Sequence, residues 1–408
     1  MRVSAISFAA FALAGCSSPS AVDTGDTDTP DLPEETHCGD GEVTAGELCF
    51  SAVATPIPLR GIHAGDMNGD GYSDLVAFGL QGVDIHASLW RNDGTGTFSS
   101  ASEKTLSGTV GSIPNLARFD QNPTYDIVAF ELAPSEGGVR VFLSDGQWGV
   151  AAPVDVLVEG AGEPWNTVVV ADVDADGLDD MLAEPYMSSE SLFVLRNTGG
   201  ALEVSPKSIE SAPNCWYSNS AQVPAFSGFT GGVIFIPGEC TGVTTSMVSL
   251  VLAQVGGEII GTTALTTGSS PAAAAAGDFD GDGAIEVLVW DRSLQAFDLY
   301  RATFVGALEP LTTMTLTELC PECENLPEAT VNMRIDAAQF DGNAASDLMI
   351  SFGDSLYFGL NPLTDTGSWS QWPTTASIKA QLVLDINNDS IDDAIFSDDV
   401  TYVLHNRH

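Results

Sequence analysis

Positive charge is scarce in this chain of 408 residues, which contains 13 lysines and arginines against 56 aspartates and glutamates. A formal net charge of −43 excludes binding to nucleic acid phosphates through counterion release. Such an excess of carboxylates also opposes compaction unless bound cations neutralise part of it. No nucleic acid partner is therefore expected, and the positions of the acids become the central question.

Histidine is rare as well, and the five histidines show no metal-ligand spacing. No glycine-rich phosphate loop opens a helix. Gly353-Asp354-Ser355-Leu356 matches the signature of a family of serine esterases, but no Asp-x-x-His follows it. A motif without its structural context is weak evidence. We therefore predict that the protein is not an enzyme and has no catalytic residues.

A hydrophobic run long enough to span a bilayer is also missing. A short apolar run at residues 5–14 follows Arg2 and leads into Leu13-Ala14-Gly15-Cys16. This segment resembles a bacterial lipoprotein signal with its lipobox. The resemblance implies that residues 1–15 are a signal peptide, that Cys16 is lipidated, and that the mature chain is anchored to a bacterial membrane. Ser17 suits the outer membrane or cell surface, and an ordinary secretory signal is the alternative.

Residues 16–37 are rich in Asp, Thr and Pro and lack hydrophobic periodicity, which predicts a disordered tether. Six further cysteines suit an oxidising compartment. They are Cys38, Cys49, Cys215, Cys240, Cys320 and Cys323. Proximity favours three local disulfides, although the sequence leaves the connectivity open. Residues 38–49 resemble a short Cys-Gly-Asp-Gly…Cys module, which implies a disulfide-stapled hairpin.

An Asp-rich loop of nine residues recurs along the rest of the chain. Complete copies are residues 66–74, 172–180, 278–286 and 385–393, each followed by an apolar strand. Residues 118–126 and 339–347 are weaker copies, and in the first of them Arg118 replaces the leading acid and can substitute its own charge for an ion. A bare equivalent stands at residues 227–232. The unit starts advance by about fifty residues, a period typical of propeller blades.

Each unit is predicted to be one blade of four antiparallel strands. Asn-x-Gly segments such as Asn92-Asp93-Gly94 indicate the turn between the third and fourth strands. The last unit is one strand short, whereas residues 50–54 have no partner before the first unit. We therefore predict an all-β, seven-bladed β-propeller over residues 50–408, with the last blade closed by the N-terminal strand.

The loops present ligands suited to a hard cation. Positions 1, 3, 5 and 9 offer carboxylates or amides, and position 7 offers a backbone carbonyl. We predict about four calcium sites with the ligand sets Asp66, Asn68, Asp70, Tyr72, Asp74; Asp172, Asp174, Asp176, Leu178, Asp180; Asp278, Asp280, Asp282, Ala284, Glu286; and Asp385, Asn387, Asp389, Ile391, Asp393. Asp341, Asn343 and Asp347 form a weaker fifth candidate. Helical periodicity, which an EF-hand requires, is missing on both sides, and acidic turns without metal remain the alternative.

The loops, their Leu-Val strands and the Asn-x-Gly-x-Phe turns are similar to FG-GAP/VCBS repeats over roughly residues 50–408. That family, which includes the integrin α-subunit head, implies a seven-bladed propeller that binds calcium in these loops and serves adhesion more often than catalysis. The expected function is a calcium-binding surface lipoprotein for adhesion, recognition or scaffolding.

Two other functions stay open, a lectin-like carbohydrate-binding propeller and a polysaccharide-acting enzyme. The candidate sugar-stacking aromatics are Trp165, Trp216, Tyr217, Trp369 and Trp372. The expected partner is an unidentified protein or glycan, the chain is expected to be a monomer, and membrane contact is expected only through the lipid anchor.

Overall fold

The computed structural model describes the chain in segments. They are residues 35–38, 49–55, 61–81, 84–106, 114–131, 138–157, 165–174, 176–185, 191–210, 215–224, 229–240, 247–254, 259–266, 268, 270–303, 306–321, 323, 333–364, 367–374, 377–397 and 401–406. These segments belong to one unit, Glu34–His408. The predicted signal peptide, the lipidation site Cys16 and nearly all of the predicted tether lie outside the described residues.

The strands form antiparallel sheets in which sequence neighbours pair. Six sheets have four strands each: β3 (Ile62–Gly65), β4 (Asp74–Gln81), β5 (Asp84–Asn92), β6 (Phe98–Leu106); β7 (Asn115–Ala117), β8 (Asp126–Glu131), β9 (Gly138–Phe142), β10 (Val154–Leu157); β11 (Trp165–Ala171), β12 (Asp180–Pro185), β13 (Ser191–Asn197), β14 (Leu202–Glu210); β15 (Cys215–Val223), β16 (Phe229–Cys240), β17 (Met247–Gln254), β18 (Ile259–Leu265); β19 (Pro271–Gly277), β20 (Ile285–Asp291), β21 (Ala296–Ala302), β22 (Leu308–Thr315); and β23 (Arg334–Ala338), β24 (Asp347–Phe352), β25 (Ser355–Leu360), β26 (Ser368–Pro373). A further sheet has the order β1-β2-β29-β28-β27, with β1 (Glu35–Cys38), β2 (Cys49–Thr55), β27 (Ala380–Leu384), β28 (Asp393–Ser397) and β29 (Thr401–Asn406).

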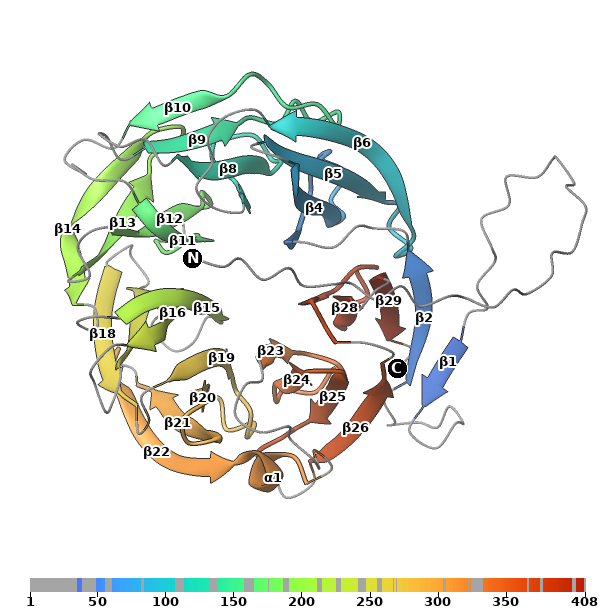
Figure 1. The fold of residues 1–408 in the computed structure, drawn as a ribbon, viewed down its shortest axis with the longest axis vertical. Helices are drawn as coiled ribbons and strands as arrows, with labels where there is room; N and C mark the ends of the chain where they lie inside the picture. Colours follow the sequence, from blue (N-terminus) through green and yellow to red (C-terminus); the bar gives the residue numbers. More distant parts are fainter. Residues whose placement is uncertain are drawn as a thin grey trace, which may run out of the picture. The chain divides into compact units, whose positions relative to one another are not determined.

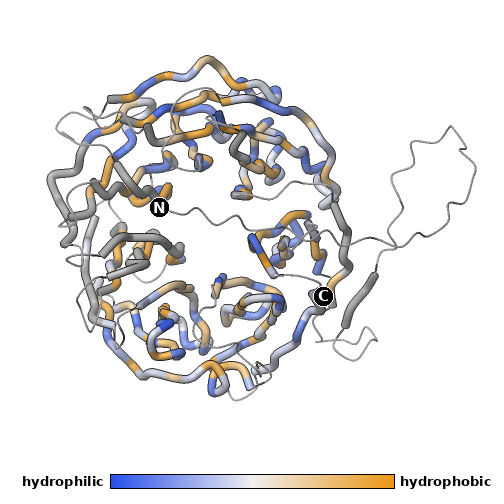
Figure 2. The backbone as a smooth tube through the Cα atoms, viewed as in Figure 1, coloured by the Kyte–Doolittle hydropathy of each residue, from blue (hydrophilic) through white to orange (hydrophobic). Residues whose placement is uncertain are grey.

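Burial changes from the inner to the outer strand of a sheet. In the sheet β19–β22, every residue of β19 and β20 is buried, whereas most of β22 is exposed. Strands buried on both faces are continuous apolar runs, as in Val287-Leu288-Val289-Trp290. Figure 2 shows apolar and polar residues interspersed along the chain.

The sheets pack face to face around a ring (Figure 1). The first strands contact one another in the order β3, β7, β11, β15, β19, β23 and β27, and β27 contacts β3. Among the described residues, a hydrophobic cluster fills each interface between consecutive sheets. No sheet can bury both of its faces alone, so the ring is the hydrophobic core.

The N-terminal strand closes the ring, as the sequence predicts. In β2, Phe50 to Thr55 pair antiparallel with β29, from Asn406 back to Thr401. Phe50 is 2% exposed and packs on the neighbouring sheet, with its ring centroid 4.6 Å from that of Phe358 and 5.7 Å from that of Phe340.

Two predicted boundaries differ from the structure. β1 begins at Glu35, within the predicted tether of residues 16–37, because residues 35–38 pair with residues 49–52 of β2. The predicted hairpin of residues 38–49 continues into the closing strand, so the two are one element; residues 39–48 lie outside the described residues.

The described residues contain one short helix, α1 (Leu316–Leu319), which follows β22. Within this described part, no helix combines the length and apolar character needed to cross a bilayer. The prediction of an all-β propeller built from four-stranded antiparallel blades is confirmed.

Candidate metal sites

Each Asp-rich loop joins the first strand of a sheet to the second. The complete copies lie between β3 and β4, β11 and β12, β19 and β20, and β27 and β28. The weaker copies lie between β7 and β8 and between β23 and β24, and the bare equivalent leads into β16, with residues 225–228 outside the described part. All of these loops therefore occupy the same connection in their sheets.

Neighbouring loops are hydrogen-bonded to one another. The backbone N–H of position 8 donates to the carbonyl of position 1 in the preceding loop. The pairs are Tyr125 N to Asp66 O at 2.9 Å, Asp179 N to Arg118 O at 3.0 Å, Ser346 N to Asp278 O at 2.6 Å, and Asp392 N to Gln339 O at 2.8 Å. The Asn388 amide also donates to Gly71 O at 3.4 Å, across the junction between the last loop and the first. The loops thus form a band on one face of the ring.

Inside a loop, the first carboxylate organises the backbone. Asp66 accepts hydrogen bonds from Gly69 N at 2.6 Å and Gly71 N at 2.9 Å. The two glycines have φ of 77° and 88°, a left-handed conformation that most side chains disfavour. The other complete loops repeat the bond from position 6 to position 1, from Gly177 to Asp172, Gly283 to Asp278 and Ser390 to Asp385. The loops are therefore copies of one conformation.

The apolar residue at position 2 anchors each loop in the hydrophobic core between the sheets. These residues are Met67, Phe119, Val173, Phe279, Phe340 and Ile386, and none is more than 3% exposed. The loop cannot lift away from the sheets without exposing this side chain to water. The loop is therefore a fixed scaffold for its carboxylates.

Position 9 carries a buried carboxylate in every complete and weaker copy. Asp74 accepts from Met67 N at 3.0 Å through one oxygen and from Asn92 N at 2.9 Å through the other. Asp180, Asp347 and Asp393 repeat both bonds. These carboxylates lock the loop onto the third strand of the sheet.

Burial makes the charge on these carboxylates unfavourable. Burial, chiefly, raises the pKa of Asp74 and Asp126 to about 6 and the pKa of Asp180, Glu286, Asp347 and Asp393 to about 7. Neighbouring loop acids add to the rise, as Asp70 and Asp66 do for Asp74. A cation bound beside position 9 would stabilise the charged form.

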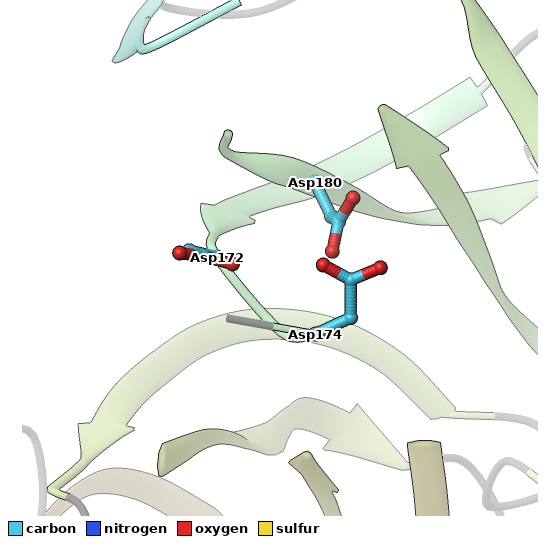
Figure 3. Close-up of side chains that lie close together, drawn as sticks. All are labelled: Asp172, Asp174 and Asp180. Atoms are coloured by element: carbon cyan, nitrogen blue, oxygen red, sulfur yellow. The ribbon is translucent and has the colours of Figure 1, made fainter. Parts of the chain in front are cut away.

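Carboxylate oxygens converge in two of the complete loops. Ligand atoms of Asp172, Asp174 and Asp180 lie within 4.8 Å of one another, as do those of Asp278, Asp280 and Asp282. Figure 3 shows the carboxylates of Asp174 and Asp180 facing each other. In the other two complete loops an asparagine, Asn68 or Asn387, stands at position 3.

The donor set fits a hard divalent cation. It consists of carboxylate and amide oxygens, which are the ligands that Ca²⁺ prefers. Asp278 Oδ1, an atom of the first ligand in its loop, is buried without a hydrogen-bond partner. An oxygen-seeking cation would satisfy such an atom.

Three arginines also reach into complete loops. Arg91 lies 3.5 Å from Asp70, Arg196 pairs with Asp174, and Arg301 pairs with three acids of its loop. None of these three arginines was predicted from the sequence to be a site residue. The sequence feature that could have indicated two of them is an Arg-Asn pair shortly before a turn glycine, at Arg91-Asn92 and Arg196-Asn197.

The weaker loops are held in other ways. The expectation that Arg118 serves its own loop is not met, because it turns to the next one, 3.3 Å from Asp179 and 3.9 Å from Asp172. Asp126 Oδ2, buried in the Arg118 loop, has no hydrogen-bond partner. In the loop 339–347, amides of Asn343 and Asn361 donate to Asp341 Oδ2. Amide donors thus occupy one carboxylate of the predicted fifth site.

An inter-sheet contact was missed at the sequence level. The side-chain amide at the end of the third strand donates to the position 2 carbonyl of the preceding loop. The pairs are Asn92 to Ile386 O at 2.7 Å, Asn197 to Phe119 O at 2.8 Å and Asn406 to Phe340 O at 2.6 Å. From the sequence these asparagines were interpreted only as turn residues, so their contact with the neighbouring sheet was not predicted. We call this contact the asparagine clamp.

Cysteines that are consecutive in the sequence lie next to each other in the structure. Cys320 and Cys323 form a disulfide, and both are buried at the end of α1. Cys215 is the Cα partner of Cys240 in the β15–β16 ladder, and Cys38 is that of Cys49 in the β1–β2 ladder.

The remaining sequence candidates lie away from the loops. Ser355 begins β25 directly after the turn at residues 353–354. Trp372 is 7% exposed within the core beside Phe50, and Trp369 packs against another core cluster. The side chains of Trp165, Trp216 and Tyr217 lie outside the described part.

Fold and loops define the chain as a β-propeller with acidic loops on one face. No family model and no curated protein matches it. Among solved structures it is similar to BBS1N, in a crystal of its complex with ARL6DN soaked with lead, at 11% identity, 87% coverage of this chain, 93% of that chain and a TM-score of 0.53.

Two other solved structures are more distant. They are the WD40 domain of Toxoplasma gondii coronin, at 10% identity, 86% and 87% coverage and a TM-score of 0.46, and a protein from Lactobacillus plantarum, at 13% identity, 80% and 96% coverage and a TM-score of 0.45. These likenesses concern the fold alone. The resemblance to FG-GAP/VCBS repeats rests on the sequence pattern of the loops.

Proposed function

We propose that this protein is an exported lipoprotein whose calcium-loaded, seven-bladed propeller serves as a surface recognition or scaffolding module without catalysis. The observation that carries the proposal is the convergence of Asp172, Asp174 and Asp180, in a loop built like the other complete copies. The proposal counts the sheet that β2 completes as the seventh blade, beside the six sheets of four strands.

Calcium is the cation that the site chemistry favours. The side-chain ligands are all oxygen atoms, and the loop is short and turns on residues of positive φ, as calcium loops do. Metal would relieve both the repulsion among clustered carboxylates and the burial of the position 9 acid. Calcium bound there would supply this charge neutralisation, while the chain holds the loop on the third strand and on the neighbouring loop.

The inter-loop hydrogen bonds give calcium a role in the whole ring. Asp179 N donates to Arg118 O, so the loop that holds Asp172 also holds the preceding sheet. Ordering one loop therefore stabilises an interface between sheets as well as a turn. A rigid face of this kind suits binding to a protein or glycan.

Export and anchoring rest on the sequence around Cys16. Lipidation there would tether the propeller to a membrane, and we propose the outer membrane or cell surface. The disulfide Cys320–Cys323 supports an oxidising compartment. We propose that the propeller acts as a monomer.

Thermal unfolding with calcium and with excess chelator, alongside metal analysis of the purified chain, tests the proposal. We expect several calcium ions per chain and a marked fall in the melting temperature on chelation, because calcium binds the folded loops only. If no metal copurifies and neither calcium nor chelator moves the transition, the loops are acidic turns and the proposal is wrong.

A further inference from the structure

One register position on the third strand distinguishes the complete loops from the weaker ones. It is the residue opposite position 9. Glu286 pairs directly with Arg301. Leu75 pairs with Trp90 and Met181 with Leu195, so the next step places Arg91 and Arg196 opposite Asp74 and Asp180.

The weaker loops carry an apolar residue at this position. Ile127 pairs with Phe142 and Leu348 with Gly359, which places Leu143 and Leu360 there. The last complete loop carries His405. The whole chain has 13 lysines and arginines, so three arginines in one register position indicate a role tied to the complete loops.

The three arginines differ in how fully they engage their loops. Arg301 is the most engaged. Its Nη2 lies 3.1 Å from Asp280, 3.0 Å from Asp282 and 2.9 Å from Glu286, and its Nε lies 3.0 Å from Glu286. These three acids are the predicted ligands at positions 3, 5 and 9.

Arg91 and Arg196 make less contact. Arg91 reaches one acid, Asp70, at 3.5 Å, and its side chain is 53% exposed. Arg196 pairs with Asp174 and is 49% exposed, compared with 32% for Arg301. The difference follows from position 9, where Glu286 is longer by one methylene than the aspartates of the other loops and reaches the guanidinium.

We propose that Arg301 is a tethered cation that competes with calcium for the loop 278–286, which makes this the weakest of the four complete calcium loops. The inference rests on the proposed function. A guanidinium bound to three of the ligands neutralises part of their charge and repels a divalent ion a few ångströms away. The contacts of Arg301 also hold its loop in place when no metal is bound. Arg91 and Arg196 hold their own loops less firmly, because each contacts fewer acids.

The test compares Arg301→Gln with Arg140→Gln by calcium titration calorimetry and by melting with calcium and with chelator. Arg140 is the matched control, because it lies in β9, pairs with Asp155 on β10 at 2.7 Å, and changes the net charge equally. We expect the weakest calcium-binding step to tighten by about tenfold or more in Arg301→Gln only. Chelation should lower its melting temperature more than that of the wild type or the control.

Glu286→Asp gives an independent check. It keeps the charge and gives this loop the acid found at position 9 of the other complete loops. Shortening the side chain withdraws it from Arg301, so the weakest binding step should tighten in this variant too.

Each other outcome is decisive. If the wild type binds calcium but Arg301→Gln leaves every affinity unchanged, the competition is refuted and the proposed function stands. If Arg301→Gln loses the same stability with and without calcium, or fails to fold in saturating calcium, Arg301 is a structural ion pair and the inference is wrong. If neither wild type nor variants bind calcium, the proposed function itself fails.

Discussion

The position 9 carboxylates show how one residue serves both fold and site. Asp180 and Asp393 are fully buried, and backbone N–H groups from two different segments hold each of them. Those bonds fix the loop, but burial raises the pKa of both acids to about 7. The residue therefore holds the loop in place at the expense of an unfavourable charge.

A pH dependence follows for the metal-free protein. Because the folded-state pKa of these acids lies above the unfolded value, their contribution to stability is full below about pH 4 and is lost as pH rises through about 7. The melting temperature in chelator should therefore include a component that falls between about pH 4 and about pH 7.

Calcium should reverse this component, because it binds the ionised acids. The rise in melting temperature that calcium produces should grow from about pH 4 to about pH 7. Melting curves across this range, with calcium and with chelator, check both statements. A calcium effect that stays constant across the range would show that the position 9 acids take no part in binding.

At the residue scale, the sequence allows a prediction where spacing along the chain determines geometry. The loop acids recur at fixed positions, so their convergence in the loop of Asp172 followed from the repeat. The partner of Arg118 did not follow, because Asp179 and Asp172 belong to the next unit and the contact depends on how two sheets pack. Arg301 was missed for the same reason, since strand register brings it to its loop.

At the scale of the element, each blade is joined to its neighbour by polar contacts as well as by its core. The asparagine clamp links the third strand of one sheet to the loop of the preceding sheet, from Asn197 to Phe119 O. Asn197 also donates to Asp179 O at 3.2 Å within its own sheet. One buried side chain thus satisfies carbonyls from two elements.

Asn197→Ala should destabilise the protein by about 1–3 kcal/mol, because it leaves buried carbonyls without a donor. Asn122→Ala is the control: its exposed amide bonds to Asp120 in its own loop, at 2.8 Å, and its removal should cost less than about 0.5 kcal/mol. Denaturant unfolding in saturating calcium measures both. Equal costs for the two variants would contradict the clamp.

Strand order could be predicted because apolar runs and turn residues recur with the loops. The sheet β15–β18 was harder, since its loop at residues 227–232 has no acids, and only the apolar run Val233–Ile236 marked it. The start of β1 at Glu35 could not be predicted, because Thr36 and His37 become a strand by pairing with β2 and carry no apolar alternation of their own.

At the scale of the whole molecule, ring closure depends on a strand from the N-terminal part of the chain that pairs with the last strand. β2 supplies the outer partner of β29 and places Phe50 against Phe340, Phe358 and Trp372. Without β2, the edge of β29 and this aromatic cluster would face water. Closure was predictable from simple strand counting, because the last unit is one strand short.

Two truncations separate closure from the preceding segment. A chain that begins at residue 34 keeps the whole unit and should melt like the full chain. A chain that begins at residue 57 lacks β1 and β2 and should melt far lower or aggregate, because an unpaired strand edge and a core aromatic are lost together. Differential scanning calorimetry on both compares them, and equal melting of the two would show that the ring closes without β2.

The position of β1 and β2 has a mechanical consequence. A pull transmitted through the chain from before Glu35 enters the molecule at β1, then β2, and so reaches the seam at β29 before any other sheet. The strand that completes the last blade therefore bears this tension directly after β1. The resistance of the ring to opening under such a pull would depend on the six residue pairs from Phe50 to Thr55 and on the burial of Phe50.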